Sequence, residues 1–247
     1  MNKYILPLFI LVLTVCTSCK PKKSKSHTDP IKSTEQTDPE VQKLAKLTKG
    51  GPLFIGEDHN DPTARSYIMK LIEKGCVQKL FLELDPEMHG ISEKPEERKA
   101  FKEDIMSVVL PYLNSIDRNL RNTIPEEFKV FTMMLNFWEN GSRNNPIKMG
   151  QLIQAALESQ YPIAIYLHDR PGSFADEKEG PLKRLQARNA FSGNFIQEKG
   201  LGAGTVILAG WGHLDETEVG RGHTLQELLG CANEEQRVIL YKKPDHR

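Results

Sequence analysis

The segment LFIGEDHNDP, residues 53–62, decides the fold because it joins an apolar strand to the start of a helix. The apolar run predicts a short strand buried on both faces, as in a parallel sheet covered by helices. Pro62 fits the first position of a helix, with Asp61 as its cap. Between strand and helix stand three ionisable side chains in a row, Glu57, Asp58 and His59. The segment therefore predicts a strand–loop–helix unit whose loop carries a cluster of charge.

Four further apolar runs are short, rich in β-branched or aromatic residues, and bounded by glycine, proline or charge. The five predicted strands are 52–56, 79–84, 162–169, 205–210 and 237–242. The segments between them repeat their apolar residues at helical spacing, as in MGQLIQAALESQ, residues 149–160. We therefore expect an α/β fold with a mostly parallel central sheet flanked by helices.

The interval between the second and third predicted strands is too long for one crossover helix. We interpret residues 92–145 as an inserted helical subdomain. It contains FTMMLNFW, residues 131–138, which we interpret as core packing, while a cap over a ligand pocket is the alternative.

The chain has 247 residues and equal numbers of acidic and basic side chains, 33 of each. A net charge of zero gives no general attraction to nucleic acid, and the sequence contains no nucleic-acid motif and no internal repeat. The length fits one α/β domain with an insertion, which we assign to residues 41–247. The expected partner is a small-molecule or peptide ligand.

The first 19 residues resemble the signal peptide of a bacterial lipoprotein, with an apolar run that ends in CTSC. The run is too short to span a bilayer comfortably. The pattern predicts lipidation of Cys19 and a membrane-anchored, extracytoplasmic protein of the bacterial cell envelope. Ordinary cleavage near Ser18 is the alternative. Residues 20–40 are polar and predict a flexible tether.

Cys76 and Cys231 are the cysteines that remain if Cys16 leaves with the signal and Cys19 carries lipid. Two lone cysteines do not make a disulfide framework, and their spacing gives no zinc signature. They either pair with each other in an oxidising compartment or are two buried thiols.

Ionisable side chains follow or end four of the five predicted strands. In strand order they are Glu57 and His59, then Glu83, then His168 and Asp169, then His213. The carboxyl ends of parallel strands share one edge of the sheet, where ligands bind in open α/β folds. Four strands that deliver histidine or carboxylate groups to one edge indicate a site.

Some of these residues have a plainer explanation. Glu57 could cap the following helix, where negative charge is favoured, and His59 could bond only the backbone of the turn. Glu83 interrupts an apolar run, so we expect it to be buried and paired, protonated or bound to a metal. Gly210 and Gly212 remove bulk on both sides of a tryptophan and allow a tight turn before the late histidine.

Residues 181–200 predict a helix whose broad apolar face also contains Arg188, Asn189 and Ser192. The apolar members of that face are Leu182, Leu185, Phe191, Phe195 and Ile196. An arginine that points inward needs a carboxylate or an anionic ligand, so we expect Arg188 to pair with Glu57 or Glu83. The alternative is an arginine whose stem packs while its head reaches water.

Four motifs together resemble those of the superfamily of ChaN-like haem-uptake lipoproteins, erythromycin esterases, TraB-type proteins and Tiki proteases. GEDHNDP resembles its GExH motif, LELD its second-strand glutamate motif, ARNAFSGNFI its arginine helix, and AGWGHL its late glycine-rich histidine motif. The motifs occur in family order within residues 52–214. The resemblance implies the site residues Glu57, His59, Glu83, Arg188 and His213.

Three functions are consistent with these residues. In a hydrolase of ester or peptide bonds, His59 or His213 would be the general base, helped by Glu57 or Glu83, and Arg188 would orient a carboxylate or stabilise an oxyanion. A divalent metal held by Glu57, His59 and His213 could instead activate the water. In a ChaN-like uptake lipoprotein, His59 and His213 would hold haem or another ligand without turnover. The third function is a partner-directed surface protein with a decayed site.

Overall fold

A computed structural model describes residues 38–85, 144–170, 180–219, 222–231 and 233–240, with a few single positions between 103 and 132. All of them belong to one compact unit, Thr37–Arg247. The predicted signal peptide with Cys19, nearly all of the predicted tether and most of the predicted insertion lie outside the described residues. Within the described part of the chain, no helix has the length and apolar character needed to cross a membrane.

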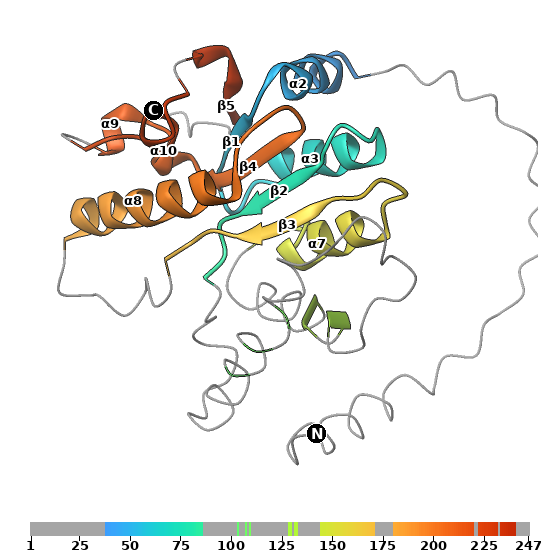
Figure 1. The fold of residues 1–247 in the computed structure, drawn as a ribbon, viewed down its shortest axis with the longest axis horizontal. Coiled ribbons are helices and arrows are strands. Elements are labelled where there is room, and N and C mark those ends of the chain that lie inside the picture. Colours follow the sequence, from blue (N-terminus) through green and yellow to red (C-terminus); the bar gives the residue numbers. More distant parts are fainter. Residues whose placement is uncertain are drawn as a thin grey trace, which may run out of the picture. The chain divides into compact units, whose positions relative to one another are not determined.

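Five parallel strands form one sheet in the order β3-β2-β4-β1-β5 (Figure 1). Their bounds are β1 Leu53–Glu57, β2 Lys79–Leu82, β3 Ala164–Leu167, β4 Thr205–Gly210 and β5 Arg237–Leu240. Each strand corresponds to a predicted apolar run, so the predicted α/β fold with a central parallel sheet is confirmed.

Helices cover both faces of this sheet. The longer ones are α2 Pro39–Gly50, α3 Thr63–Glu73, α7 Met149–Glu158 and α8 Pro181–Lys199. The short ones are η2 Trp211–His213, α9 Glu216–Val219, α10 Leu225–Leu228 and η3 Glu234–Gln236. Successive strand residues face opposite sides: Leu53 and Ile55 join the core under α2, α3 and α7, whereas Phe54 joins the core under α8 and α10.

The strand register aligns the carboxyl ends of the inner strands. Glu57, the last residue of β1, lies opposite Gly210, the last residue of β4. The amide of Glu83 donates to Leu208 O of β4 at 3.1 Å, and the amide of His168 donates to Leu82 O of β2 at 3.0 Å. The polar residues that follow these strands therefore meet at one edge, which we call the carboxyl edge.

The first described helix begins two residues before the predicted domain. Asp38 caps α2 by accepting from Glu40 N at 3.1 Å and pairs with Lys70 of α3 at 2.9 Å. Pro39 occupies the first turn, where its missing amide costs nothing. Helix α2 therefore overlaps the last two residues of the predicted tether, which ended at about residue 40.

Helix α8 corrects the predicted apolar face. Leu182 and Phe191 are 44% and 36% exposed, although the helical spacing placed them inward. Of the predicted face, Asn189, Ser192 and Ile196 are buried, and Gly193 joins them. This buried face can be polar because its side chains bond to backbone groups of the neighbouring loops, as described below.

The described residues test part of the predicted insertion and the state of the two cysteines. Val109, Phe128 and Phe131 are buried in the same core cluster as α7. Phe131 opens the stretch FTMMLNFW, so at this residue the interpretation as core packing is confirmed.

Cys76 and Cys231 are free thiols, each half-buried, and do not pair with each other.

Candidate functional site

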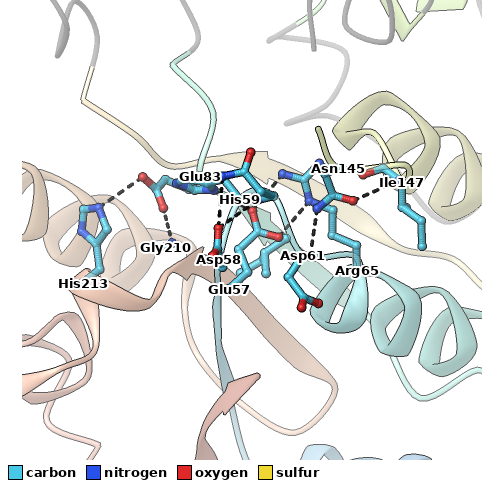
Figure 2. A network of polar contacts seen from close by, with 12 residues as sticks. Glu57, Asp58, His59, Asp61, Arg65, Glu83, Asn145, Ile147, Gly210 and His213 are labelled. Atoms are coloured by element: carbon cyan, nitrogen blue, oxygen red, sulfur yellow. Dashed lines mark hydrogen bonds and ion pairs between the residues drawn. The ribbon is translucent and has the colours of Figure 1, made fainter. Parts of the chain in front are cut away.

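The carboxyl edge brings the five predicted site residues together in two adjoining networks. One network joins Glu57, the last residue of β1, to His59 of the β1–α3 loop, and the other surrounds Glu83 after β2 (Figure 2). The two meet at Gly210: a Cβ placed there would lie 3.0 Å from His59 Nε2 and 3.3 Å from Glu83 Oε2. Glycine at this position therefore allows the two networks to touch.

Glu57 is fully buried and is held by an arginine that the sequence analysis did not identify. Arg65 of α3, also fully buried, donates from Nε to Glu57 Oε2 at 2.8 Å and from Nη2 to Glu57 Oε1 at 2.9 Å. This forked pair compensates the buried charge of the carboxylate. Arg65 shares a helical face with Ile68 and Ile72, and that apolar spacing was the signal that could have found it.

His59 has one ring nitrogen committed and one available. Its Nδ1 lies 2.8 Å from Glu57 Oε1, and because an ionised carboxylate only accepts, Nδ1 carries a proton. In the neutral ring Nε2 then has a lone pair. No protein hydrogen bond to Nε2 occurs among the described residues, and 30% of the side chain is exposed. His59 is therefore a partly exposed imidazole with one nitrogen bonded to a buried carboxylate and the other beside Gly210.

Glu83 is the centre of the second network. Its carboxylate accepts from the amide of Gly210, from Arg188 Nη2, and from His213 Nε2, which lies 3.2 Å away. Burial alone would raise the pKa of Glu83, but its interaction with His213 and the charge of Arg188 hold that pKa well below its usual range. Glu83 is therefore a buried carboxylate that stays ionised.

Arg188 confirms the predicted pairing with Glu83 and adds a second carboxylate. It donates from Nε to Asp169 Oδ1 and from Nη2 to Asp169 Oδ2, both at 2.8 Å. Burial would lower the pKa of Arg188, but the two carboxylates raise it further above its usual range. A fifth of its side chain reaches solvent, whereas the Asp169 side chain is 3% exposed.

Hydrogen bonds define the protonation of His213. Asn189 donates from Nδ2 to the carbonyl of His223 at 3.1 Å, so its oxygen faces His213 Nδ1, which must be an N–H. The other ring nitrogen, Nε2, lies 3.2 Å from Glu83 Oε1. Both ring nitrogens of His213, which is only 4% exposed, are therefore engaged. The predicted helix 181–200 supplies Asn189 as the residue that orients it.

His168 is buried at the same edge without a role in either network. Its Nε2 lies 3.0 Å from Leu208 O, so Nε2 is the protonated nitrogen, and Ser192 Oγ donates to its backbone carbonyl at 2.7 Å. Nδ1 is buried and has no hydrogen-bond partner among the described residues. Burial lowers the pKa of His168, which keeps the ring neutral.

Within the described residues, the buried carboxylates of both networks have cationic partners. Glu57 pairs with Arg65, and Glu83 and Asp169 pair with Arg188, with His213 as a further partner of Glu83. Burying carboxylates is costly unless they are paired, so each network satisfies its own charge. His59 differs from these paired groups, because it is neither a buried carboxylate nor the cation that compensates one.

Of the predicted metal and haem ligands, Glu57 and His213 do not fit the geometry. Both oxygens of Glu57 are bonded by Arg65, and both ring nitrogens of His213 are engaged. Across the described ranges, no group of three or more His, Cys, Asp or Glu side chains is arranged to hold a metal ion. Of the predicted set Glu57, His59 and His213, only His59 offers a nitrogen without a protein hydrogen bond.

Comparison with known proteins assigns neither a family nor a function to this chain. No protein-family model, curated protein or solved structure matches this chain. The resemblance to the ChaN, erythromycin esterase, TraB and Tiki superfamily stays a prediction. The site geometry comes from this chain alone.

Proposed function

We propose that the chain is a hydrolase in which His59 is the general base. The observation that carries the proposal is the Glu57–His59 pair, with Nδ1–H held at 2.8 Å by a buried carboxylate and Nε2 without a protein hydrogen bond among the described residues, on a side chain that is 30% exposed. This is the arrangement that orients an imidazole for taking a proton from a nucleophile. Of the two predicted base candidates, His213 has both ring nitrogens engaged, by Asn189 and by Glu83.

The reaction follows from the neutral His59 ring. His59 Nε2 takes a proton from water as the water oxygen bonds to the carbonyl carbon of the substrate. When the tetrahedral intermediate collapses, the bond to the leaving oxygen or nitrogen breaks and the proton passes from Nε2 to that leaving group. The products are a carboxylic acid and an alcohol or amine, and His59 is neutral again.

Arg188 supplies positive charge on the Glu83 side of the site. One fifth of its side chain is exposed, so it can approach an oxyanion that develops above the sheet edge. Glu83 bonds the amide of Gly210, the residue that packs against His59. Glu83 therefore holds the backbone next to the proposed base in place.

The choice of ester or peptide bonds rests on the resemblance to erythromycin esterases and Tiki proteases. The same resemblance, with the leader sequence, supports a lipoprotein of the bacterial cell envelope. Both are proposals, since the leader and Cys19 lie outside the described residues.

A panel of p-nitrophenyl esters and fluorogenic peptides tests the proposal on the full-length protein. We expect turnover that falls about 100- to 10,000-fold in His59→Gln, the range of a general base. His223→Gln is the matched control, because the His223 side chain is 70% exposed and lies in neither network. Equal rates for His59→Gln and wild type would overturn the proposal, as would bound haem in the visible spectrum of a protein without turnover.

A further inference from the structure

Arg65 makes more contacts than charge compensation alone requires. Besides its fork to Glu57, it donates from Nη1 to the backbone carbonyl of Ile147 at 2.8 Å. Its side chain has no exposed surface, and neither does that of Glu57. Arg65 therefore ties the carboxylate behind His59 to a second segment of the chain (Figure 2).

That second segment, residues 144–148, is bonded to the loop that carries His59. Asn145 Nδ2 donates to Asp61 O at 2.9 Å, and the amide of Asn144 donates to Asn60 Oδ1 at 3.3 Å. Asn145 itself is fully buried and also accepts from the amide of Ile147 at 3.0 Å. The catalytic loop is thus pinned from α3 and from the start of α7 at the same time.

The protonation of Glu57 decides which nitrogen of His59 is basic. While Glu57 is ionised it can only accept, so His59 carries its proton on Nδ1 and has its lone pair on Nε2. If Glu57 took up a proton it would donate to Nδ1, and the neutral ring would carry its hydrogen on Nε2. In that tautomer the exposed nitrogen cannot accept a proton from water.

A buried carboxylate stays ionised only when a partner compensates its charge. Arg65 is the partner that bonds both oxygens of Glu57. We infer that Arg65 is a positioning residue that fixes the Nδ1–H tautomer of His59 through Glu57. Its catalytic consequence rests on the proposed function, whereas the tautomer is a property of the resting protein.

Two-bond proton–nitrogen NMR of the full-length protein with ¹⁵N-labelled histidine reads the tautomer directly. The His59 signal is identified by its loss in His59→Gln. In the wild type we expect the neutral ring to be protonated at Nδ1. Arg65→Gln, which removes the charge, should shift the ring to the Nε2–H form, and Arg65→Lys, which keeps the charge, should restore Nδ1–H.

Lys70→Met is the matched control, because it removes an ion pair from the same helix without touching Glu57. It should leave the His59 tautomer unchanged. An unchanged Nδ1–H signal in folded Arg65→Gln would overturn the inference. If Arg65→Gln does not fold, the wild type still decides, because a neutral His59 protonated at Nε2 would overturn it equally.

Kinetics separate this inference from the proposed function. We expect Arg65→Gln to lower kcat about 100- to 10,000-fold with little change in KM, and Arg65→Lys to recover part of the loss. A tautomer that shifts as expected while His59→Gln keeps full activity would sink the hydrolase proposal and leave the positioning role intact. A tautomer that stays unchanged in Arg65→Gln, together with loss of activity in His59→Gln, would remove the role of Arg65 and leave His59 as the base.

Discussion

Replacing Arg188 with methionine tests whether the second network is a buried charge network or a solvated surface pair. The variant removes both bonds to Asp169 and one bond to Glu83. Glu83 keeps Gly210 N–H and His213. Asp169, whose side chain is 3% exposed, keeps the amide of Arg170 but loses both bonds to Arg188.

The expected loss follows from the burial of the two partners. Removing one member of a buried ion pair costs about 3–5 kcal/mol, and we expect the lower end, about 3 kcal/mol, because 20% of the Arg188 side chain reaches water. For a chain of this length each kcal/mol lowers Tm by about 2–4 °C, so the expected shift is about 6–12 °C. Urea unfolding followed by circular dichroism measures the free energy of unfolding directly.

Two further variants show where the loss arises. Arg237→Met is the matched control, since Arg237 is also 20% exposed but pairs with Glu216, whose side chain is 61% exposed, and it should cost less than about 1 kcal/mol. Asp169→Asn combined with Arg188→Met should recover about 1–3 kcal/mol relative to the sum of the single losses. A loss below about 1 kcal/mol for Arg188→Met, or strict additivity in the double variant, would refute the buried network.

Three other changes test neighbouring parts of the reasoning. Gly210→Ala would place a Cβ 3.0 Å from His59 Nε2, so we expect at least a tenfold loss of turnover with a native-like melting temperature. Gly202→Ala, which meets no atom within 4 Å, is its control, and equal activity of the two would contradict the close approach. Cys19→Ala should abolish incorporation of labelled palmitate, and label that persists would refute the predicted anchor. Because burial lowers the pKa of His168 below 6.5, the unfolded chain binds more protons there, so the free energy of unfolding should fall as pH drops below about 6.5. In His168→Asn that part of the pH dependence should be lost; a wild type with pH-independent stability between pH 7 and 5.5 would contradict it.

The sheet and its carboxyl edge could be predicted because they depend on local pattern. Apolar runs bounded by glycine and charge define strands, and the shared edge of a parallel sheet places Glu57, Glu83 and His213 together without any knowledge of the packing. The inward direction of Arg188 also followed from helical angles, and its need for a carboxylate followed from the cost of burial.

The buried face of α8 and the role of Arg65 could not be predicted, because they depend on which neighbouring surface each helix packs against. Leu182 and Phe191 share the expected spacing of a buried face, but α8 turns its polar side toward the loops, and periodicity does not say where the core lies. The sequence does not identify Arg65 as buried, because an arginine among apolar residues is equally consistent with a surface side chain whose aliphatic stem packs on the core. Its partner is eight positions back along the chain, across a loop, where helical spacing gives no guidance.

Charge balance explains why a chain would place so many ionisable groups at one buried edge. A lone carboxylate behind His59 would take up a proton on burial and leave the imidazole with the wrong tautomer, so the base requires a cation as buried as the carboxylate itself. The second network repeats the arrangement, with Arg188 paired to Glu83 and Asp169, and His213 paired to Glu83. In the proposed mechanism, pairing keeps the buried carboxylates ionised while the second nitrogen of His59 exchanges protons with the substrate.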